Sequence, residues 1–293
     1  MYTSYYGMSV NPFLKSENIK YKFESKDFKE TINRLNYIKE IKGVCLITGH
    51  TGYGKTFSIR YFINELSQDL YKVIYISATN EMTVFDFYKA LCDQLYLDTG
   101  ACYRAEIYQK IQNEFKRLVK KERVQPIVII DDAHVLKREI INNFKVFYDF
   151  DMDSTDYVSL IIVGQVELKD ILMKNIFESL KQRIIVNYTF NVFSREEVCE
   201  YVKSRLKIAD TNQDIFEIDA LNALYACSKA SPRRLNTLII NSLMLGHQNE
   251  KIKIDSNIII DAKKEMDLLN WKEKNEGFWI YCKVYGLLCD NGI

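Results

Sequence analysis

The chain has 293 residues and a formal net charge of +1, with 47% hydrophobic and 27% charged residues. These values are ordinary for a globular protein and leave room for one large domain, or for a large and a small one. The near-zero net charge excludes a global field that attracts nucleic acid, so any DNA-binding surface must be a local patch. The seven cysteines show no C-x-x-C spacing, which favours reduced thiols in a cytoplasmic protein over disulfides or zinc.

The first strongly patterned segment is a short strand that leads into a glycine-rich loop. Residues 44–48 are an apolar, β-branched run typical of a buried strand. The next eight residues, 49–56, read GHTGYGKT and complete the phosphate-binding pattern G-x-x-x-x-G-K-[ST]. Residues 57–66 then carry the apolar side of a helix. Because strand, loop and helix follow one another as the motif requires, the sequence predicts a nucleoside triphosphate site.

Each part of this loop has a predicted task. The glycines let backbone N–H groups converge on the β- and γ-phosphates, and the helix N-terminus adds a partial positive charge. Lys55 supplies a cation for the β/γ oxygens, while the Thr56 hydroxyl is placed to ligate Mg²⁺. The predicted nucleotide-binding residues are Gly49, Thr51, Gly52, Tyr53, Gly54, Lys55, Thr56 and Phe57.

Strands and helices alternate along the next part of the chain. We predict strands at 73–76, 127–130, 159–165 and 183–186, and helices at 83–95 and 104–121. This alternation indicates a mostly parallel sheet covered by helices on both faces. From residue 194 to residue 269 the pattern is helical, beginning with a capping box over 194–197. A small helical domain is therefore expected after the α/β core.

The strand at 127–130 ends in two carboxylates, Asp131 and Asp132. Its four aliphatic residues are typical of a strand buried on both faces, and functional residues in such parallel sheets lie at the carboxyl ends of the strands. Asp131 is predicted to hold Mg²⁺ through its water shell. Asp132 is predicted to orient or deprotonate the attacking water.

Six elements, in their order, resemble the AAA+ ATPases of the ExeA type and, more broadly, the transposition ATPases TniB, TnsC and MuB. They are Asn-Pro-Phe at 11–13, the phosphate loop, Asp-Asp-Ala-His at 131–134, VGQVEL at 163–168, LKQRI at 180–184 and SPRRLN at 231–236. The resemblance implies an α/β P-loop NTPase core of the AAA+ type, with a parallel sheet sandwiched by helices, followed by a small all-helical lid. Residues 1–190 are then the nucleotide-binding domain, including a family segment at 1–40. Residues 191–269 are the lid, and residues 270–293 are a tail of unknown role.

The resemblance also implies ATP and Mg²⁺ as ligands, ATP hydrolysis as the reaction and roles for three further residues. Gln165 matches sensor 1, Arg183 matches the arginine finger offered to a neighbouring subunit, and Arg233 matches sensor 2 in the lid, with Arg234 as the alternative. The predicted catalytic residues are Lys55, Asp132, Gln165, Arg183 and Arg233.

Two departures from the family pattern affect these expectations, and the role of one further residue is open. Asp132 replaces the usual glutamate and is one methylene shorter, so slow hydrolysis is expected. Ala230 stands where the family prefers glycine. His134 is left open between polarising the water and a plainer capping or packing role.

Two biological interpretations compete, both implied by the resemblance. In the first, a homo-oligomer, ring or filament, assembles on double-stranded DNA and recruits or activates a transposase. Its contacts to DNA phosphates would come from a set of basic residues, namely Arg104, Lys110, Lys116, Arg117, Lys120 and Lys121. The alternative interpretation of these residues is a solvated helix face without a partner. In the second, the chain remodels a secretion or envelope assembly. That branch typically carries a membrane span and a wall-binding domain, which we do not expect here, and this favours the first interpretation. A third possibility is a nucleotide-gated scaffold with little hydrolysis.

Overall fold

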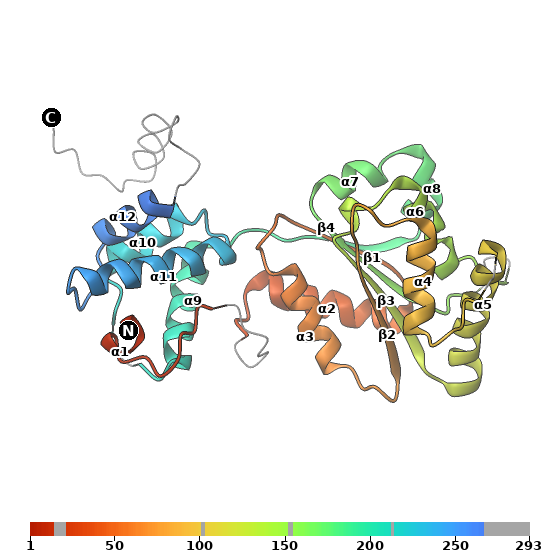
Figure 1. Cartoon of the computed structure of the whole chain (residues 1–293), viewed down its shortest axis with the longest axis horizontal. Helices are drawn as coiled ribbons and strands as arrows, with labels where there is room; N and C mark the ends of the chain where they lie inside the picture. Colours follow the sequence, from red (N-terminus) through yellow and green to blue (C-terminus); the bar gives the residue numbers. More distant parts are fainter. Residues whose placement is uncertain (15–21, 101–102, 152–154, 212–213, 267–293) are drawn as a thin grey trace. The chain divides into compact units, whose positions relative to one another are not determined.

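The computed structural model describes residues 1–14, 22–100, 103–151, 155–211 and 214–266 (Figure 1). The predicted tail at 270–293 lies outside the described residues. The chain divides into two compact units. The α/β unit is Lys26–Asn191, and the helical unit combines Met1–Ser25 with the segment that begins at Val192. No helix in the described part of the chain is long and apolar enough to cross a bilayer.

The α/β unit contains a five-stranded parallel sheet in the order β2-β3-β4-β1-β5. The strands are β1 (Gly43–Thr48), β2 (Tyr71–Ser77), β3 (Gln125–Asp131), β4 (Ser159–Gly164) and β5 (Ile184–Thr189). The predicted parallel sheet is therefore confirmed, and all four pairs of neighbouring strands run parallel. Because β3 and β4 flank each other, and β4 flanks β1, the phosphate loop, the Asp131–Asp132 pair and Gln165 follow the carboxyl ends of three adjacent strands.

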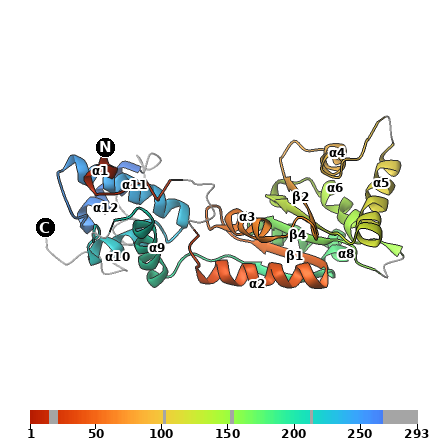
Figure 2. The same ribbon diagram turned by 90° about the horizontal axis from the view of Figure 1, so that it is seen from below.

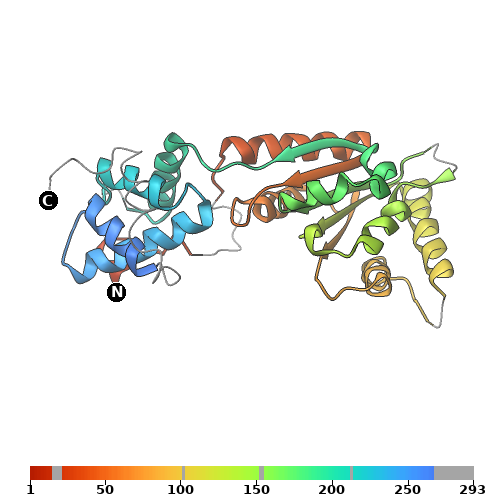
Figure 3. The ribbon, with the colours of Figure 1, turned by 90° about the horizontal axis from the view of Figure 1, so that it is seen from above.

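Helices cover both faces of this sheet, as predicted. Successive side chains of each strand point to opposite faces of the sheet, as the pleat requires. Ile127 and Ile129 pack with α2 (Lys26–Ile41) and α3 (Lys55–Glu65), while Val128 and Ile130 face the opposite core. That second core contains α4 (Val84–Gln94), α5 (Arg104–Arg117), α6 (Arg138–Asn142), α7 (Glu167–Leu172) and α8 (Glu178–Lys181). Figure 2 shows α2 and α4 on opposite sides of the strands, and Figure 3 shows the same separation from the other side.

Two of the predicted helices have ends with clear local causes. The helix expected at 83–95 begins at a capping box in which Thr83 and Asp86 satisfy each other's backbone N–H groups. The helix expected at 104–121 is α5 followed by a π-helical turn, Leu118–Glu122. Arg123 then adopts a left-handed conformation with φ 59°, which ends the helix before β3.

The helical unit consists of α1 (Tyr2–Tyr5), α9 (Arg195–Ile208), α10 (Ile218–Cys227), α11 (Pro232–Gln248) and α12 (Ser256–Met266). The predicted capping box is present: Ser194 Oγ accepts from the Glu197 N–H, and the Glu197 carboxylate accepts from the Ser194 N–H. Pro232 occupies the first turn of α11, where its missing N–H costs no helical hydrogen bond.

The first residues of the chain pack in the helical unit and not in the α/β unit, which differs from the predicted extent 1–190. Tyr6, Met8 and Phe13 are buried in the helical core. The Tyr6 hydroxyl donates to the Lys251 carbonyl at 2.9 Å. A Cβ at Gly246 would lie 2.5 Å from the Tyr6 hydroxyl oxygen, so the glycine makes room for this ring. This N-terminal segment is thus stabilised by the apolar helices of the helical unit, although its position in the sequence suggested the α/β domain.

The turn before α11 explains the departure at Ala230. Lys229 and Ala230 have φ values of 51° and 50°, the left-handed region in which a Cβ is strained. Glycine at either position would remove that strain. The Ala230 methyl group is buried, whereas Lys229 is exposed. Glycine at position 229 would therefore relieve the backbone strain without removing a buried apolar contact.

We therefore expect Lys229→Gly to raise the free energy of unfolding of the helical unit by about 0.5–1 kcal/mol, the relieved strain less the extra entropy of unfolded glycine. Lys229→Ala, which keeps the Cβ, is the matched control and should change stability little. Chemical denaturation of the two variants beside the parent chain measures the difference. An equal gain for alanine and glycine would show that backbone strain is not the cause.

Candidate nucleotide-binding site

The loop between β1 and α3 has the backbone of a phosphate cradle. Gly54 precedes α3 with φ 104°, no side chain caps the helix, and no acidic residue lies in its first turn. A Cβ at Gly54 would meet nothing within 4 Å, so the loop is open at this point. Gly49 is different, because a Cβ there would lie 2.7 Å from the Phe190 Cβ. Backbone N–H groups at the start of α3 are therefore available to an anion.

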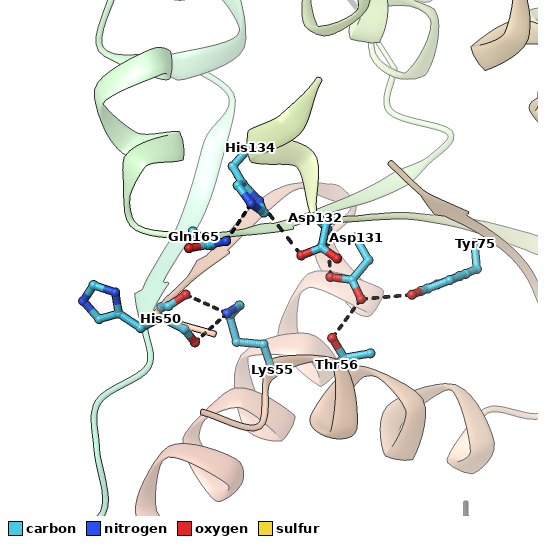
Figure 4. A network of polar contacts seen from close by, with 9 residues as sticks. His50, Lys55, Thr56, Tyr75, Asp131, Asp132, His134 and Gln165 are labelled. Atoms are coloured by element: carbon cyan, nitrogen blue, oxygen red, sulfur yellow. Dashed lines mark hydrogen bonds and ion pairs between the residues drawn. The ribbon is translucent and has the colours of Figure 1, made fainter. Parts of the chain in front are cut away.

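Lys55 lies in the middle of this loop with only 8% of its surface exposed. Its Nζ donates to the carbonyls of Gly49 at 2.6 Å and His50 at 3.0 Å (Figure 4). These bonds compensate the burial of the ammonium group and hold it at the position where phosphate oxygens would meet it.

Asp131, at the end of β3, is 3% exposed and is surrounded by donors from three elements. Thr56 Oγ1 and the Tyr75 hydroxyl each donate to its Oδ2 at 2.9 Å, and the Asp132 N–H donates to its Oδ1 at 2.9 Å (Figure 4). The structure thus brings together Thr56 and Asp131, the two predicted magnesium ligands. Hydroxyl and carboxylate oxygens are the hard donors that Mg²⁺ prefers, so the two residues fit that ion.

Tyr75 was not among the predicted site residues. It lies on β2 opposite Ile129 in the parallel pairing, two residues before the Ser77–Asp131 pair, so its side chain reaches Asp131 along one face of the sheet. Burial raises the pKa of the Tyr75 hydroxyl, and the neighbouring Asp131 carboxylate raises it further, which keeps the group a donor. The pairing of β2 with β3 was not specified by the sequence pattern, so no sequence signal pointed to this contact.

The other predicted catalytic groups of the sheet edge also lie together. Asp132 adopts a left-handed conformation with φ 54°, and 56% of its side chain is exposed. His134 follows in a 3-10 turn, Ala133–Val135, and its Nε2 lies 2.8 Å from the amide nitrogen of Gln165. Gln165 itself directly follows β4, next to the Asp131 strand, as predicted.

Among the remaining loop residues, Thr51 is exposed and Gly52 has φ 85°. The Tyr53 ring packs edge-on to His50 and contacts the core beneath α2 and α3. Phe57 lies in the first turn of α3, and its ring centroid lies 6.1 Å from that of Phe28.

Arg183 is distant from the phosphate loop of its own chain. It directly precedes β5, whose first residue Ile184 pairs with Val44, whereas the loop follows Thr48 at the other end of β1. Five residues of strand at ~3.3 Å per residue separate the two by roughly 16 Å. The Arg183 guanidinium lies 4.7 Å from the centroid of the Tyr148 ring. Its side chain therefore does not reach the phosphate loop of its own chain.

Arg233 and Arg234 are both exposed in the first turn of α11, in the helical unit. Asn236 of the same motif accepts a hydrogen bond from the Tyr201 hydroxyl at 2.6 Å, which ties α11 to α9. This contact gives the asparagine of the SPRRLN motif a structural task.

Most of the predicted basic DNA-contact set is paired within the chain. Lys116 and Lys120 lie 2.6 and 3.9 Å from Asp151. Arg117 bonds to Glu114 and Glu122. Lys110 donates to the Asp98 carbonyl at 3.0 Å. This side of α5 therefore presents interleaved charges of both signs.

Comparisons with known proteins agree with this geometry. A model of the family described as "AAA domain" matches residues 38–172. General secretion pathway protein A of Aeromonas hydrophila is 28% identical over 282 residues, which is 95% of this chain and 50% of that protein. The chain therefore spans about half the length of this relative.

Two solved structures share the fold. Cdc6p from Pyrobaculum aerophilum superimposes with a TM-score of 0.68 at 14% identity, covering 88% of this chain and 71% of that one. The Aeropyrum pernix ORC1 protein, in a structure described as a complex with DNA, gives 0.60 at 17% identity, covering 84% and 66%.

Sheet order, phosphate loop and helical unit define a P-loop protein with the AAA+ fold. The predicted resemblance to ExeA-type proteins agrees with the similarity to General secretion pathway protein A and with the AAA-domain match.

Tyr75→Phe tests the geometry around Asp131. Removing one of the donors that fix the carboxylate should raise the Mg²⁺ concentration required for nucleotide binding about tenfold, a typical effect of losing a group that orients a metal ligand. Tyr188→Phe is the matched control, because its hydroxyl donates to Asp27 at 2.9 Å in the same unit. Titration of a fluorescent ATP analogue against Mg²⁺ gives both values. Equal Mg²⁺ dependence of the two variants would show that Tyr75 has no role at this site.

Proposed function

We propose that this chain binds ATP with Mg²⁺ and hydrolyses it slowly, as a subunit of a homo-oligomer. The observation that carries the proposal is the contact of Thr56 with the buried Asp131 beside Lys55, because three predicted phosphate and metal groups converge there. Thr56 Oγ1 would hold Mg²⁺ directly and Asp131 through water. A divalent cation held there would neutralise charge that develops on the phosphate oxygens.

The remaining residues supply the water and its orientation. Asp132 has the exposed carboxylate of the site and is the candidate base for the attacking water. Gln165 lies at the neighbouring strand end, where its amide can contact both the water and the γ-phosphate. The shorter aspartate reaches less far than a glutamate, which supports slow turnover and a role as a timing switch. Arg233 would contact the γ-phosphate from the helical unit, with Arg234 as the alternative.

The position of Arg183 supports a site shared between subunits. It lies at the amino ends of the strands, whereas its own phosphate loop lies at their carboxyl ends. In a ring or filament, the end of the sheet that carries Arg183 in one subunit could meet the phosphate loop of the next subunit. Each nucleotide site would then receive a cation from its neighbour. Tyr148 would hold the guanidinium ready beneath that interface.

Arg183→Ala should therefore lower ATP turnover by about 10³-fold while leaving ATP affinity unchanged. Lys55→Ala should lose binding, because it removes the loop cation. Mixing the two variants should restore turnover, since a Lys55→Ala subunit still offers Arg183 to its neighbour. Arg195→Ala, an exposed arginine bonded to Asn222, is the matched control. Failure of the mixture to recover activity would contradict a finger acting between subunits.

For the biological role, we propose a DNA-bound regulator of transposition that recruits or activates a transposase. This is supported by the motif resemblance to the transposition ATPases and by the likeness in fold to an ORC1 protein described in complex with DNA. The alternative, work on a secretion or envelope assembly, is supported by the relative named General secretion pathway protein A. A nucleotide-gated scaffold would bind ATP without turning it over.

Duplex DNA separates the first two roles. If α5 contacts phosphates, DNA should stimulate turnover at low salt, and binding should weaken steeply as salt rises. Asp151→Asn should tighten DNA binding by a few-fold, because it frees Lys116 and Lys120 and removes a negative charge. Asp261→Asn, which breaks the exposed pair with Lys264, is the matched control. Turnover indifferent to DNA would favour the secretion role, and absence of turnover would favour the scaffold.

A further inference from the structure

His134 stands between the two groups expected to handle the attacking water. Its Nε2 lies 2.8 Å from the amide nitrogen of Gln165, and its Nδ1 lies 4.0 Å from Oδ1 of Asp132 (Figure 4). Only 15% of the histidine side chain is exposed, against 56% of the Asp132 side chain. One imidazole ring thus faces a sensor amide on one side and a candidate base on the other.

The backbone holds the ring in this place. Asp132 turns the chain in a left-handed conformation, φ 54° and ψ 32°, so that Ala133–Val135 folds back beside the end of β4. Gly164 permits the close approach, because a Cβ there would lie 3.3 Å from the His134 backbone nitrogen and 2.7 Å from Leu168 Cδ2. The contact between His134 and Gln165 is therefore built into the way two neighbouring strands end.

The hydrogen bond determines which nitrogen carries the proton. The Gln165 nitrogen is a donor, so His134 Nε2 accepts from it and the neutral ring must carry its hydrogen on Nδ1. Nδ1 is buried and has no hydrogen-bond partner in the described part of the chain. The carboxylate 4.0 Å away is beyond hydrogen-bond distance, but it belongs to an exposed side chain that is free to rotate toward the ring. A buried donor without a partner favours that closure.

Closure would prepare both groups for the reaction. With one Asp132 oxygen on Nδ1, the other is left to accept from the water. With one Gln165 N–H on Nε2, the second N–H and the amide oxygen face the phosphate and the water.

We propose that neutral His134 is a positioning residue that holds the Gln165 amide and the Asp132 carboxylate together for attack on ATP. The inference rests on the proposed ATP hydrolysis. It assigns His134 no transfer of its own proton and no contact with the nucleotide.

Kinetics provide the first test. His134→Ala should lower kcat roughly 10-fold to 100-fold, the range for groups that orient reacting ligands, while the Kd for a non-hydrolysable ATP analogue changes less than about twofold. The effect should be non-additive: in the His134→Ala background, Gln165→Ala should cost little more. Unchanged kcat, or full additivity with Gln165→Ala, would overturn the proposal.

Two conservative variants separate the two sides of the ring. The amide of His134→Asn can replace the Nδ1 donor, and that of His134→Gln can replace the contact at Nε2. Each should therefore give a kcat between those of the parent chain and His134→Ala. His247→Ala, which removes a ring packed edge-on against Tyr5 in the helical unit, is the control and should leave kcat unchanged. If both conservative variants are as slow as alanine, His134 acts by packing alone.

A second readout does not need turnover. The chain has three histidines, so the ¹⁵N imidazole resonances can be assigned with His134→Gln. We expect His134 to be neutral with the proton on Nδ1, Gln165→Ala to shift its Nε2 resonance, and Asp132→Ala to shift its Nδ1 resonance in the ATP-analogue complex. A proton on Nε2 would overturn the inference even in an active enzyme. The expected spectrum in a chain without turnover would instead show that the proposed hydrolysis has failed and the contact has not.

Discussion

The buried carboxylate of Asp131 constrains the rest of the α/β unit. A charge removed from water must be matched by donors, and here they come from the start of α3, from β2 and from the backbone that follows β3. Satisfying this one carboxylate therefore requires the pairing of β2 with β3, the approach of the phosphate loop and the turn that carries Asp132. The hydroxyl that would bind Mg²⁺ is held in place by the same contact.

The sequence predicted this framework well because its signals are local. The strands at 44–48 and 127–130 are continuous apolar runs, and the glycine loop lies directly between a strand and a helix. Contacts between distant segments carried no such signal. Tyr75 reaches Asp131 because β2 pairs in one register, and Lys116 meets Asp151 because a later loop returns beside α5. Both depend on the fold as a whole, and each changes the expected chemistry.

The packing of the N-terminal segment is a second contact between distant parts of the chain that the local sequence pattern did not predict. Its Asn-Pro-Phe element pointed to a family, but position in the chain suggested the α/β domain. Tyr6, Met8 and Phe13 instead complete the helical core, around a glycine in α11 that leaves room for a ring. The chain thus begins in the helical unit, forms the α/β unit and returns. Both connections leave the α/β unit near Asp27, whose carboxylate accepts from Tyr188 and from the Asn191 backbone.

A parallel sheet separates the two ends of its strands, and this makes one chain an incomplete catalyst under the proposed mechanism. Loop, carboxylates and sensor amide all follow carboxyl ends, where helix dipoles and backbone N–H groups favour anions. Arg183 precedes β5 and so lies at the amino ends of the strands. No rotation of its side chain spans a full strand length, so Arg183 does not reach the phosphate loop of its own chain, and the proposed mechanism takes this cation from a neighbouring subunit. Under the proposed mechanism, a nucleotide that draws Arg183 of the next subunit would stabilise the interface between the two subunits, and its hydrolysis would weaken that interface. The groups around His134 come from one chain, so the rate of hydrolysis that they set would determine how long that interface persists.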